Sequence, residues 1–89
     1  MTLKIRTGRG MVELDDQEAA ELRERLSLAP EAKPAEETIA VSANASTSVR
    51  FTERQEAAVL AVLNEWVEEA GSAAPRGVID LRDALAEKG

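Results

Sequence analysis

The longest run of regularly spaced apolar side chains lies between residues 49 and 71. Apolar residues recur there at i, i+3, i+4, i+7, i+8 and i+11, which places them on one face of a helix. They are Val59, Val62, Leu63, Trp66, Val67 and Ala70. Thr52 is a favourable N-cap with Gln55 three residues on, and Gly71 supplies a left-handed stop. The pattern predicts a helix over residues 53–70 whose apolar face needs a cover.

A second capped helix is predicted to follow Asp15, because Glu18 stands three residues further on and repeats the capping logic. It runs to about Leu28 and stops before Pro30. Its narrow apolar stripe consists of Ala19, Leu22 and Leu26. We expect this helix to lie beside the longer one.

Alternating apolar and polar residues near the start of the chain predict a β-hairpin. Leu3 and Ile5 lead into the Gly-Arg-Gly sequence of residues 8–10, and Val12 and Leu14 follow it. Period-two alternation around a glycine-containing turn is typical of paired antiparallel strands. Lys4 or Arg6 is then expected to face Glu13 across the strands.

The middle of the chain is interpreted as a linker and two more strands. Residues 29–37, APEAKPAEE, are rich in proline and charge and predict a linker. Residues 38–43 predict a third strand with Ile39 and Val41 on one face, because β-branched residues favour strands. Residues 44–46 form the expected turn, and residues 47–51 the fourth strand.

The two halves resemble each other, which we interpret as a ββα unit used twice; the alternative is chance likeness between two capped amphipathic helices. Residues 12–26 parallel residues 49–63 at a constant offset, with matches at the capping pair and at several apolar positions. We therefore predict one α+β domain over residues 1–89, a two-layer sandwich of duplicated ββα units at residues 1–28 and 38–71. Its sheet is four-stranded and mostly antiparallel, with the two main helices on one face. A short C-terminal helix is expected at residues 78–88.

Residues 51–71, FTERQEAAVLAVLNEWVEEAG, followed by Pro75, Ile79 and Leu85, resemble the opening of the winged-helix domain in LexA-type repressors. That opening has a Thr-x-Arg-Gln cap, an apolar helix, a glycine, a proline and a second helix. The segment here is net acidic. We interpret the likeness as shared capping chemistry, and no DNA-contacting residue is carried over.

Charge and composition narrow the classes of partner. The net charge is −6, split evenly as −3 in residues 1–48 and −3 in residues 49–89. Without a basic patch, non-specific nucleic-acid binding is disfavoured. No apolar run approaches the ~18 residues needed to span a membrane, and the N-terminus lacks the apolar core of a secretory signal. Eight arginines against three lysines, with much alanine, favour a bacterial origin. We expect a cytoplasmic protein with no membrane partner.

The residue inventory restricts catalysis. Histidine, cysteine and tyrosine are absent, which removes the usual general base and the Ser-His and Cys-His nucleophile systems. The adjacent carboxylates at residues 15–16, 36–37 and 68–69 are expected to be solvated. No segment has the alternating oxygen ligands of a dedicated Ca²⁺ or Mg²⁺ site. We therefore predict no catalytic residue, no metal ligand and no cofactor.

The remaining candidate site is an interface. With only two aromatic residues, the core must be thin, so apolar helix surface is left to spare. Trp66 is either a core anchor or an interface hot spot, where tryptophan is enriched. The residues predicted to form the interface are Trp66, Val59, Val62, Leu81 and Leu85.

By elimination, we expect a small acidic protein-interaction or regulatory module without catalytic activity, which binds another protein or a second copy of itself. This expectation predicts an exposed apolar patch or a homodimer. One alternative is an acidic inhibitor of a basic partner, such as an antitoxin, immunity protein or nucleic-acid mimic, with its carboxylates on one face. The other is a carboxylate-based enzyme or enzyme subunit, with a concave pocket and a buried Asp or Glu.

Overall fold

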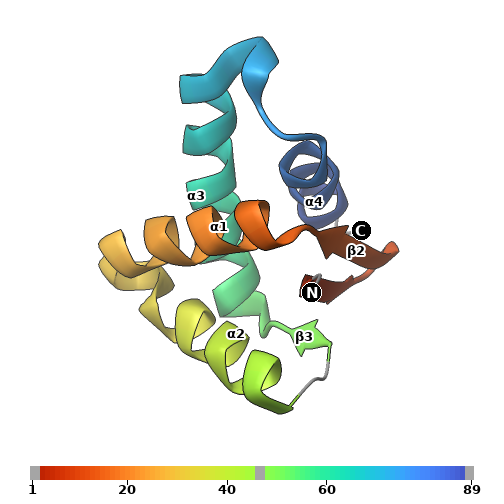
Figure 1. Cartoon of the computed structure of the whole chain (residues 1–89), viewed down its shortest axis with the longest axis vertical. Coiled ribbons are helices and arrows are strands. Elements are labelled where there is room, and N and C mark those ends of the chain that lie inside the picture. The colour runs from red at the N-terminus through yellow and green to blue at the C-terminus, as the bar shows by residue number, and fades with distance from the viewer. Residues whose placement is uncertain (1–2, 46–47, 88–89) are drawn as a thin grey trace.

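The structure is a computed structural model that describes residues 3–45 and 48–87. These residues form four α-helices and a three-stranded sheet (Figure 1). The elements in order are β1 (Leu3–Thr7), β2 (Gly10–Leu14), α1 (Asp16–Leu28), a 3₁₀ turn (Pro30–Ala32), α2 (Lys33–Ala45), β3 (Val49–Arg50), α3 (Glu53–Ala70), a 3₁₀ turn (Gly71–Ala73) and α4 (Arg76–Ala86).

The predicted hairpin is confirmed. β1 and β2 pair antiparallel, with Leu3 opposite Leu14 and Lys4 opposite Glu13. The alternation turns Leu3, Ile5 and Leu14 into the core, and the Lys4 ammonium lies 3.9 Å from the Glu13 carboxylate. Gly10 has a φ of 119°, a conformation that favours glycine, and this lets the chain reverse tightly.

The predicted four-stranded, mostly antiparallel sheet is wrong. The sheet has three strands in the order β2-β1-β3 and is mixed, because β3 pairs parallel with β1. The predicted fourth strand shrinks to Val49–Arg50, and Thr47 lies outside the described residues. The second half of the chain therefore contains no strand pair of its own in its described part, and the duplicated ββα unit is not formed.

The predicted third strand is a helix. Residues 38–43 lie within α2, and the predicted linker forms the 3₁₀ turn and the first turn of that helix. Helical spacing brings Ala35, Ile39 and Ser42 into the core, whereas Val41 points to solvent. Packing against α1 and α3 thus overrides the strand preference of the β-branched residues. The predicted turn is also wrong where it is described, since α2 runs to Ala45; Ser46 lies outside the described residues.

The two capped helices are confirmed. α1 follows Asp15 and α3 follows Thr52, and both N-termini form complete capping boxes. α3 ends at Gly71, whose φ is 57°. Each helix follows a strand and a buried apolar residue, Leu14 or Phe51, and this is the part of the predicted pattern that the structure shows.

α3 is the helix around which the others pack. It contacts α1, α2 and α4, and Figure 1 shows α1 crossing it with α4 beside its C-terminal half. The buried face of α3 consists of Val59, Val62, Leu63 and Trp66. The cover predicted for this face was a sheet, but three helices supply most of it. No helix among the described residues is long and apolar enough to cross a membrane.

Candidate functional site

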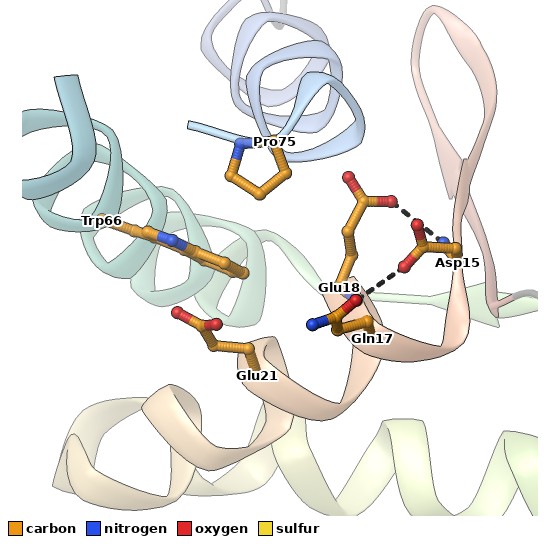
Figure 2. A pocket seen from close by; sticks show the side chains of 6 residues that line it. All are labelled: Asp15, Gln17, Glu18, Glu21, Trp66 and Pro75. Atoms are coloured by element: carbon orange, nitrogen blue, oxygen red, sulfur yellow. Dashed lines mark hydrogen bonds between the residues drawn. The ribbon is translucent and has the colours of Figure 1, made fainter. Parts of the chain in front are cut away.

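The five residues predicted to form an interface lie in the core of the single chain. Trp66 is 3% exposed, and Val59, Val62, Leu81 and Leu85 are also buried. α3 and α4 bring them together against the sheet and α1. They form no exposed surface in this structure. Only the edge of the Trp66 ring borders a hollow, which lies between α1 and Pro75 (Figure 2).

The carboxylate pairs at residues 15–16, 36–37 and 68–69 lie in different elements and have different surroundings. Asp15 accepts a hydrogen bond from the backbone N–H of Glu18 at 2.7 Å as a helix cap. Glu36 is half-buried and pairs with Arg23 at 3.1 Å. Glu68 and Glu69 are exposed near the end of α3. Among residues 3–45 and 48–87, no group of three or more acidic side chains is placed to hold a metal ion.

Two adjoining hollows run along α1 and share Gln17 and Glu21. The first, of about 270 Å³, is lined by Asp15, Gln17, Glu18, Glu21, Trp66 and Pro75 (Figure 2). The second, of about 560 Å³, is lined by Gln17, Ala20, Glu21, Glu24, Arg25, Leu28 and Glu69. Because they are continuous along one helix face, we treat them together as the α1 groove.

The α1 groove is strongly acidic. Its lining contains five carboxylates and one guanidinium, a formal net charge of −4. The whole chain carries −6, so most of its excess negative charge faces this groove. A concave surface lined by one sign of charge attracts the opposite sign. The groove is therefore electrostatically suited to a cation or a cationic chain.

Glu18 connects the N-termini of α1 and α4 beside the first hollow. One of its carboxylate oxygens accepts from the backbone N–H of Asp15 at 3.0 Å, and the other from the backbone N–H of Gly77 at 3.1 Å. A Cβ atom at Gly77 would lie only 2.8 Å from this carboxylate and 2.9 Å from Leu14. Only glycine lets α4 begin so close to α1. Figure 2 shows the result, with Asp15 and Glu18 on one side of the hollow and Trp66 with Pro75 on the other.

Arg25 is a cation already seated in the groove. Its guanidinium carbon lies 4.7 Å from the centre of the Trp66 ring, which is cation–π geometry. Arg25 also pairs with Glu21 at 3.1 Å and with Glu69 at 3.5 Å. The groove thus holds one guanidinium between two carboxylates and an aromatic face.

Leu28 adds an apolar contact at the far end. Its side chain is 79% exposed, although it lines the second hollow. The apolar stripe predicted for α1 did not include it, and the groove was not predicted. The signal was present, because Gln17, Glu21, Glu24 and Leu28 recur at i, i+4, i+7 and i+11 on one helix face.

Comparison with protein-family models, with curated proteins and with solved structures gives no match for this chain. Its function is therefore argued from the groove and its surroundings.

Proposed function

We propose that this chain is a small protein-interaction or regulatory module without catalytic activity, which binds a protein partner along the α1 groove. The observation that carries the proposal is Leu28, which is 79% exposed within a concave surface. Exposing a leucine costs free energy in the isolated chain, roughly 1.5–3 kcal/mol relative to its full burial. A partner that covers it recovers part of that free energy.

The first alternative, an acidic inhibitor of a basic partner, is favoured by the charge of the groove. Five carboxylates gather along α1 and the end of α3, as that alternative requires. It is a special case of the same proposal, in which the bound partner is basic and loses its activity. The carboxylate-based enzyme has less support, because Asp15 and Glu18 are committed to backbone hydrogen bonds and Glu21, Glu24 and Glu69 are exposed.

Photo-crosslinking in cells of the natural host tests the proposal. A photoreactive residue replaces Leu28 in one version of the chain and Val41 in the other; Val41 is 69% exposed on α2 and serves as the matched control. We expect position 28 to form a discrete adduct with a protein that mass spectrometry identifies, and position 41 not to do so. Equal labelling from both positions, or none from position 28, would contradict the proposal.

A further inference from the structure

The α1 groove presents different chemistry at its two ends. One end combines the Asp15, Glu18 and Glu21 carboxylates with the Trp66 edge and Pro75. The other end presents the exposed Leu28. Glu18 and Leu28 lie ten residues apart on α1, a distance of about 15 Å at ~1.5 Å per residue.

We propose that the groove binds a basic amphipathic segment of a partner protein. An arginine of that segment enters the hollow beside Trp66 and Pro75, and an apolar side chain about 15 Å away covers Leu28. The inference rests on the proposed function and adds the chemistry of the partner. The spacing corresponds to about three turns of a helix laid along α1.

Charge decides between the possible occupants. A second copy of the chain that docked groove to groove would bring a net charge of −4 against another −4. Like charges that face each other in an interface disfavour the complex. Nucleic-acid phosphates would meet the same repulsion. A cationic segment gains attraction along the whole groove, and charge steering also speeds its association.

The chain itself shows how the groove receives arginine. Arg25 places its guanidinium over Trp66 and between Glu21 and Glu69. A guanidinium is planar and forms paired hydrogen bonds with carboxylates, whereas a lysine ammonium is a hydrated point charge. The first hollow is lined by the carboxylates of Asp15, Glu18 and Glu21, together with Pro75 and the edge of the Trp66 ring (Figure 2). Arginine is therefore preferred over lysine there.

Peptide titration tests the inference. The probes are a helical synthetic peptide with arginines and leucines on one face, its lysine counterpart and its glutamate counterpart. Binding is followed by calorimetry and by the fluorescence of Trp66, the only tryptophan in the chain. We expect the arginine peptide to bind at least fivefold more tightly than the lysine peptide, to weaken steeply with salt, and the glutamate peptide not to bind.

A matched pair of double variants locates the site. Glu24→Lys with Leu28→Ser changes an exposed carboxylate and an exposed apolar residue spaced i, i+4 on α1. Glu37→Lys with Val41→Ser makes the same changes at the same spacing on α2. The net charge is equal in both variants. We expect the α1 variant to lose at least tenfold in affinity and the α2 variant to lose less than threefold.

Four results of these experiments would overturn the inference or a part of it. Equal losses in the two variants would reduce the binding to long-range charge and overturn the inference. Equal affinity for the arginine and lysine peptides would overturn the arginine site, and tight binding of a single-stranded oligonucleotide would overturn the choice of partner. If the arginine peptide does not bind while position 28 still crosslinks a protein, this inference fails and the proposed function stands.

Discussion

Glu18 completes the capping box of α1, and Gln55 completes that of α3. Each side chain matches the hydrogen bonds available to it, so replacing Glu18 by glutamine or Gln55 by glutamate should destabilise the fold. Glu18 accepts hydrogen bonds from two backbone N–H groups, those of Asp15 and Gly77. Gln55 accepts one, from Thr52 at 2.9 Å, and its amide nitrogen donates to Thr38 Oγ1 at 3.0 Å and to a backbone carbonyl at 3.3 Å. The first position needs two acceptors, and the second needs an acceptor and a donor.

The perturbation is Glu18→Gln. A glutamine has one carbonyl oxygen, so one of the two backbone donors loses its acceptor and faces an NH₂ group instead. Hydrogen bonds to charged groups contribute about 1.5–3 kcal/mol when well buried. Glu18 is only half-buried, so we expect a loss of about 1–2 kcal/mol in the free energy of unfolding. For a domain of this size, each kcal/mol lowers Tm by about 4–8 °C.

The mirror perturbation is Gln55→Glu. The carboxylate loses its donor and turns toward the carbonyl oxygen of Pro34, which costs about 1–3 kcal/mol. The extra negative charge in the first turn of α3 returns about 0.3–1 kcal/mol through the helix dipole. The expected net loss is about 1 kcal/mol.

Urea unfolding followed by Trp66 fluorescence measures both variants, since Trp66 is 3% exposed and its emission shifts on unfolding. Gln17→Glu is the control, because Gln17 lies exposed in the first turn of α1; it should change stability by less than about 0.5 kcal/mol. If Glu18→Gln and Gln55→Glu are as stable as the wild type, the hydrogen bonds of Glu18 and Gln55 do not stabilise the fold in the way described.

Further predictions concern the core, the α1–α4 approach and the sheet. Trp66→Ala should lower the free energy of unfolding by about 3–5 kcal/mol because Trp66 is nearly fully buried, and a smaller loss by urea unfolding would contradict the core role. Gly77→Ala should also destabilise, although alanine favours helices by about 1 kcal/mol, because its Cβ would meet the pinned Glu18 carboxylate; a raised Tm would refute this. Arg50→Thr should stabilise by about 0.2–1 kcal/mol by removing a like-charge neighbour of Arg6, and calorimetry would expose a loss instead.

Local signals predicted the elements that carry strong chemistry of their own. The hairpin follows from alternation around Gly10, and α1 and α3 follow from their caps and apolar periodicity. The turn glycine, the capping residues and the apolar periodicity all lie within, or a few residues from, the elements that they predict. The helix at the C-terminus was also predicted, although it begins at Arg76 rather than residue 78, and its predicted end at Lys88 lies outside the described residues.

The error at α2 came from giving strand preference more weight than helix-start signals. Ile39 and Val41 alternate with smaller residues, but Pro34 and the acidic residues that follow it mark the first turn of a helix. The buried residues Ala35, Ile39 and Ser42 also fit a helical spacing. Ala35 and Ser42 have small side chains that gave a weak hydrophobic signal beside Ile39, so the tertiary contacts with α1 and α3 are what identify the buried face.

The spacing of residues along α1 gave a signal for one wall of the candidate site, but the other walls come from elements distant in the sequence. Trp66 and Glu69 come from α3, and Pro75 precedes α4, yet all three border a face of α1. The burial of Trp66 agrees with its interpretation as a core anchor, whereas the residues predicted to form an interface lie on apolar faces that the fold buries. Which side of α1 meets other elements depends on how the helices cross, and no local pattern specifies that.

Amide chemical-shift mapping shows whether the α1 groove is the surface that binds the partner. The isotope-labelled chain would be titrated with the arginine peptide, and the shifts of backbone amides and of the Trp66 indole followed. We expect the largest shifts at five positions: Gln17, Glu21, Leu28, Glu69 and the Trp66 indole. Shifts confined to the outer face of the sheet, or spread evenly over the surface, would contradict this expectation.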